Sequence, residues 1–247
     1  MKVKDTYNKT QLNPDATFER HVYHRDQFAH YLRWTHVLKR ASIGMNILDF
    51  GCGSGNLVEV FYRNRLRPKN YLGLDIRQQT INKLKDEYKD LGWAFFNCLD
   101  LCATSFPRYK NQPDIICSFE VAEHIGKKNI SQFLTNIHQN MGENTLLLIS
   151  TPCYDSVVGA ADNHIIDGEV GEFTYDEFRA HLEENFKIIN QWGTFASKKD
   201  YKKLIPTDLL PYYERLNEYY DDNLISNLMA PLFPRQSRNV LWECKLI

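Results

Sequence analysis

The segment NILDFGCGSGNL, residues 46–57, constrains the fold more than any other part of this sequence. An apolar stretch is followed there by three glycines, Gly51, Gly53 and Gly55, which alternate with small residues. Glycine permits a sharp strand-to-helix turn, positive φ and close approach of a ligand to the backbone. Free N–H groups at a helix start favour a negatively charged group. The segment therefore predicts a strand, a ligand-binding turn and a helix.

Short apolar runs alternate with amphipathic segments through most of the chain. A first helix is predicted within residues 26–41, and Thr174 with Glu177 forms a capping-box pattern. Near-continuous apolar runs such as TLLLIS indicate a parallel sheet covered on both faces. The prediction is a doubly wound, mostly parallel α/β fold. Its strands are expected at about 46–50, 71–75, 93–98, 114–119, 144–150 and 186–192, and its later helices at about 56–66, 78–90, 127–140 and 174–185.

Length and composition suit one domain over residues 1–247, with an N-terminal arm and helix in 1–43. The formal net charge of −1 disfavours a protein that binds duplexes mainly through phosphates. Six scattered cysteines without a C-x-x-C pair predict a reducing cytoplasm. The sequence contains no run of about 18 apolar residues, so no membrane span is predicted. The sequence leaves the oligomeric state open.

An acid ends the second predicted strand. Asp75 follows Gly51 by 24 residues, where a carboxylate can hold a ribose diol. The alternative is a purely structural glycine turn. A dinucleotide site is disfavoured because the spacing is G-x-G-x-G, with Asn56 where the third glycine of G-x-G-x-x-G would stand.

Four separated motifs carry a resemblance to a known family. ILDFGCGSG, Asp75, LD at Asp100 and DIICSFEVAEHI occur in the order typical of class I S-adenosylmethionine-dependent methyltransferases. The resemblance covers about residues 44–193 and implies S-adenosyl-L-methionine as cofactor. It also implies a Rossmann-like sheet of seven strands whose last strand is antiparallel, and NVLWECKLI (239–247) suits that strand.

Residue roles follow from this resemblance. Asp49 and the glycine turn would lie under the methionyl part of the cofactor, Asp75 would hold the ribose hydroxyls, and Asp100 would face the adenine. Phe119 and Glu120 would line the sulfonium and open onto the acceptor. The whole implied cofactor set is Asp49, Gly51, Cys52, Gly53, Gly55, Asp75, Ile76, Asp100, Leu101, Phe119 and Glu120.

The segment 198–236 would then be an insertion before the last strand, on the substrate side. A connection this long is usually functional or disordered, so it is expected to form a lid over the acceptor pocket. A dimer contact is the alternative. The residues of the predicted lid that could wall the acceptor pocket are Tyr201, Tyr212, Tyr213, Tyr219, Tyr220 and Phe233.

The EVAEH motif, followed by STP, resembles two O-methylating subgroups: quinone-biosynthesis enzymes and enzymes that 2′-O-methylate RNA 3′ ends. The latter bind a divalent metal through a Glu-x-x-Glu-His cluster and a later histidine. Here these would be Glu120, Glu123, His124 and His164, the first three sharing a helical face at i, i+3 and i+4. A metal is possible but not expected, because Glu-His is common in the superfamily. His124 and His164 are the predicted catalytic residues.

Three functions remain open at this point. The first is O-methylation of a small molecule, and the second is 2′-O-methylation of RNA or a nucleotide. The third is a cofactor-binding protein without turnover. No Asx- or Ser-Pro-Pro-aromatic motif follows the fourth predicted strand, which counts against methylation of base amines.

Overall fold

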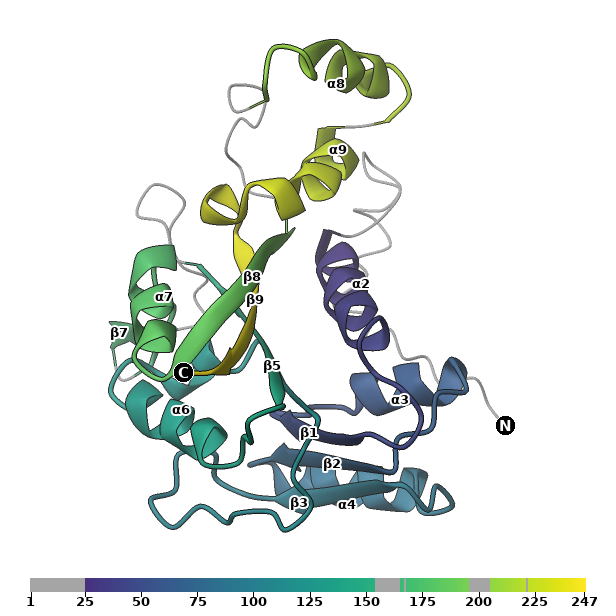
Figure 1. Cartoon of the computed structure of the whole chain (residues 1–247), viewed down its shortest axis with the longest axis vertical. Helices are drawn as coiled ribbons and strands as arrows, with labels where there is room; N and C mark the ends of the chain where they lie inside the picture. Colours follow the sequence, from purple (N-terminus) through teal and green to yellow (C-terminus); the bar gives the residue numbers. More distant parts are fainter. Residues whose placement is uncertain (1–24, 154–164, 167, 196–204, 221) are drawn as a thin grey trace.

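The computed structural model describes residues 25–153, 165–166, 168–195, 205–220 and 222–247 (Figure 1). A seven-stranded sheet has the order β3-β2-β1-β4-β5-β9-β8. β1 to β5 are parallel, and β9 lies antiparallel between β5 and β8. This confirms the predicted doubly wound sheet and its antiparallel last strand. The strands are β1 (Asn46–Phe50), β2 (Asn70–Asp75), β3 (Ala94–Cys98), β4 (Ile115–Phe119), β5 (Leu146–Pro152), β8 (Phe186–Phe195) and β9 (Asn239–Leu246).

Helices cover both faces of the sheet, and an apolar cluster fills each interface. One cluster includes side chains of α2 (Arg25–Leu38), α3 (Asn56–Arg63) and α4 (Gln78–Glu87). The other includes side chains of α6 (Ile130–His138) and α7 (Tyr175–Glu183). Sequence periodicity explains this arrangement, since the buried residues of each helix recur along one stripe.

Local chemistry sets several helix ends. The predicted capping box is present, because Thr174 accepts a hydrogen bond from the Glu177 N–H and the Glu177 carboxylate accepts one from the Thr174 N–H. The predicted helix 127–140 is shorter than expected. It is preceded by a separate turn, α5 (Ala122–Ile125), which ends where Gly126 has φ 80°. Gly126 interrupts the helical path because its backbone is left-handed there.

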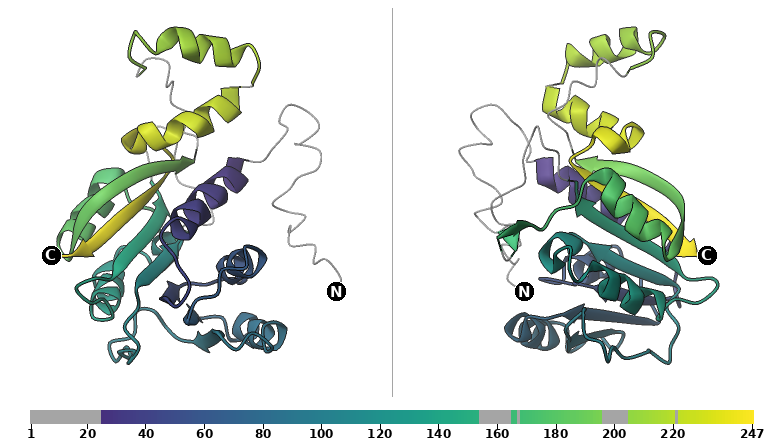
Figure 2. Two further views of the ribbon diagram at one scale, coloured as in Figure 1. Left: turned by 45° about the vertical axis from the view of Figure 1, so that its right-hand side comes forward. Right: turned by 90° about the vertical axis from the view of Figure 1, so that its left-hand side faces the viewer.

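A helical segment joins β8 to β9. It contains α8 (Leu210–Asn217), α9 (Asp222–Met229) and two short 3-10 turns, η3 (Ala230–Leu232) and η4 (Pro234–Gln236). Phe195 pairs with Asn239, so the chain leaves and re-enters the sheet at neighbouring positions on the carboxyl edge of the parallel strands. α9 packs against α2, and η3 against β8, whereas α8 lies beyond α9 from the sheet and has no buried residue (Figure 2).

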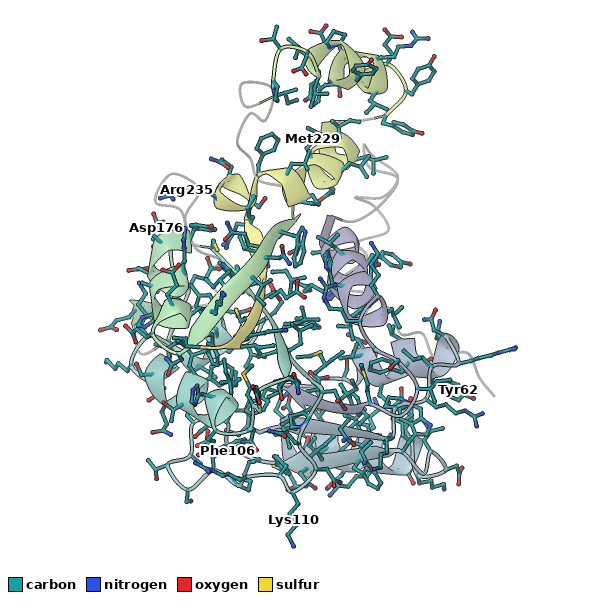
Figure 3. All side chains as sticks on the ribbon, viewed as in Figure 1. Tyr62, Phe106, Lys110, Asp176, Met229 and Arg235 are labelled. Carbon is teal, nitrogen blue, oxygen red and sulfur yellow. The ribbon has the colours of Figure 1, made fainter. Side chains whose placement is uncertain are left out.

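Contacts elsewhere fix the end of this helical segment. Arg235 of η4 forms an ion pair with Asp176 of α7, and Figure 3 shows the two side chains next to each other. A two-stranded hairpin, β6 (Ile165–Ile166) and β7 (Glu169–Val170), precedes α7. Among the described residues, no helix is long and apolar enough to cross a bilayer.

Candidate active site

The predicted motifs meet at one edge of the sheet. The glycine turn follows β1, Asp75 ends β2, Asp100 follows β3 and Glu120 follows β4. Because these four strands are parallel neighbours, their carboxyl ends share that edge. The chain also reverses its direction of strand addition between β1 and β4. Ligands of doubly wound sheets bind in the crevice outside such a reversal.

Two of the turn's glycines are required by close contacts as well as by φ. Gly51 has φ 82°, and a Cβ added there would lie 2.3 Å from Cγ2 of Val121, the residue after Glu120. Gly55 has φ 81°, and its Cβ would lie 2.6 Å from Leu84 of α4. The turn is therefore packed directly against the end of β4. The backbone approaches its surroundings more closely than a side chain would permit.

Four hydrogen bonds hold the Asp75 carboxylate. Oδ2 accepts from the Gly53 N–H at 3.0 Å and from Arg77 Nη2 at 3.2 Å. Oδ1 accepts from the Arg77 N–H at 2.9 Å and from Arg77 Nε at 3.0 Å. Burial alone would raise the pKa of Asp75, but the hydrogen bonds from Arg77 and Gly53 and the Arg77 charge lower it. The carboxylate is thus ionised, oriented by the turn and able to accept hydrogen bonds from hydroxyl groups.

Asp49 lies beneath the turn and is buried. Its Oδ2 accepts a hydrogen bond from the Tyr71 hydroxyl at 2.5 Å. Burial raises the pKa of Asp49 to about 7, the Tyr71 hydrogen bond opposes that rise, and the Asp75 charge adds to it. Burial and these two carboxylates also raise the pKa of the Cys52 thiol. Cys52 is therefore a neutral packing residue of the turn rather than a nucleophile.

The remaining predicted cofactor residues lie along the same edge with different exposure. Ile76 is 64% exposed next to Asp75, so an apolar surface is accessible there. Asp100 is exposed, and its Oδ1 accepts from the Cys102 N–H at 2.9 Å, whereas Leu101 is buried in the core. Phe119 is half-buried at the end of β4.

Glu120 has a left-handed backbone with φ 57°, which is uncommon for a residue other than glycine. Its N–H donates to the Ser150 carbonyl at 3.0 Å, and its Oε1 accepts from the Ser150 hydroxyl at 2.8 Å. Oε1 also lies 2.7 Å from Nη1 of Arg33, and Oε2 accepts from the Asn239 amide. Strained backbone held by several partners is typical of functional sites.

The shared helical face expected for the Glu-x-x-Glu-His cluster is wrong in one respect. α5 begins at Ala122, so Glu120 lies outside the helix. Glu123 is 1% exposed and accepts from the Thr151 hydroxyl at 3.0 Å. The His124 side chain is 56% exposed, with Nε2 3.9 Å from Glu123 Oε1. Burial first, and then the Glu120 charge, raise the pKa of Glu123.

The three described candidates, Glu120, Glu123 and His124, do not by themselves form a metal-binding cluster. Within the described ranges, no cluster of three or more His, Cys, Asp or Glu side chains could hold a metal ion. The Glu120 carboxylate already faces the Arg33 guanidinium, whose charge opposes a second cation. The fourth candidate, His164, lies outside the described residues, as does Tyr201 of the predicted lid.

Several contributors were not predicted from the sequence, Arg77, Arg33 and Asn239 among them. Arg77 follows the strand-ending acid by two positions, so a basic residue just after such an acid could have signalled it. Arg33 and Asn239 come from distant parts of the chain and reach Glu120 only through the packing of α2 and β9. No local sequence pattern signals such contacts.

A surface hollow of about 730 Å³ lies away from this site. Its lining includes Tyr62, Arg65 and Trp93, which precede or flank the starts of β2 and β3. It therefore opens near the amino edge of the strands. Tyr62, labelled in Figure 3, lies near the end of α3, whereas the glycine turn precedes the start of that helix. The hollow is consequently separate from the glycine turn.

The tyrosines in and just after α8 differ in exposure, and Tyr213 is half-buried. Tyr212 is 71% exposed, and α8 lies beyond α9 from the sheet (Figure 1). Tyr219 and Tyr220, just after α8, are exposed as well. In this structure α8 projects away from the sheet, whereas α9 and η3 of the same segment pack against α2 and β8.

Comparison with known proteins identifies the architecture. Residues 23–205 match a family model described as a methyltransferase domain. A comparison with curated proteins found no match. Among solved structures, a TehB-like SAM-dependent methyltransferase from Corynebacterium glutamicum aligns with TM-score 0.54 and 16% identity over 91% of this chain and 98% of that chain. A methyltransferase from Clostridium acetobutylicum aligns with TM-score 0.57 and 13% identity over 97% and 98%.

A third similar structure contains the product of methyl donation. The N-methyltransferase NodS from Bradyrhizobium japonicum, in complex with S-adenosyl-L-homocysteine, aligns with TM-score 0.56 and 12% identity over 90% of this chain and 87% of that chain. At these identities the structural matches establish a shared fold.

Proposed function

Because the chain belongs to the class I S-adenosylmethionine-dependent methyltransferases, we propose that it methylates an oxygen of a small-molecule acceptor. The glycine turn, Asp75 and the exposed Ile76 fit the cofactor, since they provide an open backbone, a diol-binding carboxylate and an apolar surface. When bound, the cofactor supplies a methyl group that its sulfonium already activates. The chain's own task is alignment of the acceptor and removal of its proton.

Arg77 has to move for Asp75 to receive a ribose diol. Its guanidinium occupies both carboxylate oxygens, and its side chain is 61% exposed, so a path into solvent is open. The Gly53 N–H can stay on Oδ2 while hydroxyls replace the guanidinium. Before the diol binds, burial raises the pKa of Asp75, but the hydrogen bonds and charge of Arg77 and the Gly53 N–H lower it and hold the carboxylate ionised.

The observation that best supports O-methylation is the pairing of His124 with Glu123. An exposed imidazole at the carboxyl edge, 3.9 Å from a buried carboxyl group, is suited to accept a hydroxyl proton. Hydroxyl acceptors need such a base, and positioned bases contribute about 10²–10⁴-fold. His164 is proposed as its partner, on the resemblance alone.

Titration calorimetry and a methyl-transfer assay test this proposal together. S-adenosylmethionine should bind the purified chain, and transfer should be measured to catechols and other hydroxylated metabolites and to short RNAs, with and without Mg²⁺ or Mn²⁺. Methyl transfer to a metabolite that continues in the presence of a chelator supports the proposal. Transfer to RNA ends that requires metal supports the second candidate, and binding without any transfer supports a non-catalytic protein.

Histidine variants separate a base from a structural residue. His124→Ala and His164→Ala should lower kcat about 10²-fold or more while cofactor affinity barely changes. His138→Ala is a matched control, because His138 is an exposed histidine of α6. Near-normal turnover in both site variants, together with no effect of chelator, would leave alignment alone as the source of the rate.

A further inference from the structure

Arg33 brings a buried positive charge from α2 to the turn after β4. The residue is 2% exposed, and its Nη1 lies 2.7 Å from Glu120 Oε1. Its Nη2 donates to His30 Nδ1 at 2.9 Å. Burial and the Arg33 charge lower the pKa of His30 to about 3, so this imidazole is neutral and adds no charge. Glu120 therefore faces one buried cation.

Stability does not explain this ion pair well. Among the described residues, Arg33 Nε and Nη1 have no hydrogen-bond acceptor, so Nη1 is at ion-pair distance from Glu120 without being aligned for a hydrogen bond. Buried ion pairs contribute little net stability even with good geometry. Arg40, just after α2, provides the contrast: it donates to both oxygens of Glu243, at 2.7 and 2.8 Å.

Arg33 is connected to the methyl transfer through the position of its partner, Glu120. Glu120 precedes Val121, which lies against Gly51 of the cofactor turn. The Glu120 carboxylate contacts Ser150 of β5 and Asn239 of β9. A carboxylate there attracts the sulfonium of the methyl donor but not the neutral thioether of the product. Interactions that favour only the state before transfer slow the reaction.

We propose that Arg33 is a positioning residue that holds the Glu120 carboxylate and offsets its charge, so that the site does not favour the sulfonium strongly over the neutral product. This inference rests on the proposed methyltransferase function. It adds a task for α2, which ties the first described helix to the reacting end of the site. Ser150 and Asn239 orient the carboxylate as neutral donors, whereas Arg33 alone of the described residues is paired to it by charge.

The ratio of two dissociation constants tests the proposal without an acceptor. S-adenosylmethionine and S-adenosylhomocysteine differ in the charge on sulfur, and calorimetry gives a dissociation constant for each. Arg33→Met should shift the ratio on the order of 10-fold in favour of the sulfonium compound. Glu120→Gln should shift it in the opposite direction, because Arg33 would then be unopposed. The double variant should return the ratio close to the wild-type value.

Arg40→Met is the matched control. It removes an arginine that ties the end of α2 to the sheet through Glu243, so it should lower stability and leave the ratio unchanged. If Arg33→Met does not fold, Glu120→Gln and the charge-preserving Arg33→Lys still decide: the first should shift the ratio and the second should not. Equal weakening of both ligands in the folded variants would overturn the proposal. Failure of wild type to bind either compound would instead refute the proposed function itself.

Discussion

At the scale of single residues, Asp75 has a carboxylate that is held in place and can still be reached by a ligand. Its carboxylate is fixed by the backbone of the glycine turn and by its own neighbour, Arg77. The backbone donors are compatible with a bound diol, whereas the guanidinium competes with it. Because the Arg77 side chain is 61% exposed, solvent screens this ion pair on one side, so the competition weakens binding only modestly.

Asp75→Ala should weaken cofactor binding about 30- to 150-fold. The variant loses charge-assisted hydrogen bonds to both ribose hydroxyls, together about 2–3 kcal/mol. Calorimetry with S-adenosylhomocysteine measures the effect. Asp86→Ala serves as control, because the Asp86 side chain is 85% exposed on α4. An unchanged dissociation constant in folded Asp75→Ala would rule out the ribose assignment.

Asp49 predicts a pH dependence of stability. Its pKa of about 7 in the folded chain lies above the ordinary 3.8, mainly because the side chain is buried. Between these values the folded chain binds more protons here than the unfolded chain, so the free energy of unfolding falls as pH rises from about 4 to about 7. The full loss, a few kcal/mol, is present above pH 7.

Asp49→Asn should remove that loss. The amide oxygen still accepts the Tyr71 hydrogen bond, so the variant should be more stable than wild type at pH 8 and similar to it at pH 4. Denaturant unfolding across this range provides the measurement, with the exposed Asp86→Asn as control. Identical pH slopes for wild type and Asp49→Asn would show that Asp49 ionises normally.

The site residues that could be predicted from the sequence are those that follow or end a predicted strand. The glycine turn and Asp75 each end a predicted strand, and parallel strands bring such ends together. Arg33 could not be found in this way, because its contact with Glu120 depends on how α2 lies on the sheet. The helical face assigned to Glu120 was wrong because its left-handed backbone delays the start of α5.

At the scale of elements, the segment between β8 and β9 departs most from expectation. The break in alternation after residue 197 coincides with the helical segment between β8 and β9. Its helices and their direction could not be read from the sequence, because Pro, Tyr and charged residues gave no clear period. α9 and η3 bury Ile225 and Ala230, whereas α8 buries none of its side chains.

Replacing residues 198–236 with a short turn should abolish turnover and retain cofactor binding. The replacement is feasible because Phe195 and Asn239 are paired neighbours, and it keeps the Asn239 contact with Glu120. Turnover and calorimetry are the two measurements. A second variant changes four exposed residues to Ser: Tyr212, Leu216, Tyr219 and Tyr220. It keeps the segment and removes only contacts made by side chains in and just after α8. Full turnover in both variants would refute a role in acceptor binding.

At the scale of the whole molecule, the candidate site spans two parts of one sheet. The turn and the acids follow β1, β2 and β3, whereas Glu120 follows β4 and two of its partners, Ser150 and Asn239, belong to β5 and β9. A ligand that contacts both parts opposes their separation. Binding to the folded state alone stabilises it by mass action.

S-adenosylhomocysteine at 100 times its dissociation constant should raise the free energy of unfolding by about 2.7 kcal/mol. Denaturant unfolding with and without the compound gives this quantity. Asp75→Ala at the same concentration should show little of the increase. A wild-type increase far below this value would mean that the compound also binds the unfolded chain or that unfolding is not two-state.

The antiparallel position of β9 has a consequence for synthesis on the ribosome. β8 is translated well before β9, yet its described place in the sheet is beside β9 and not beside β5. The five parallel strands can associate as they emerge, while β8 waits for its neighbour and leaves the edge of β5 open. We expect nascent chains stalled before residue 239 to be protease-sensitive after β5 and protected before it. Equal protection of β8 in such chains would show that it first pairs elsewhere.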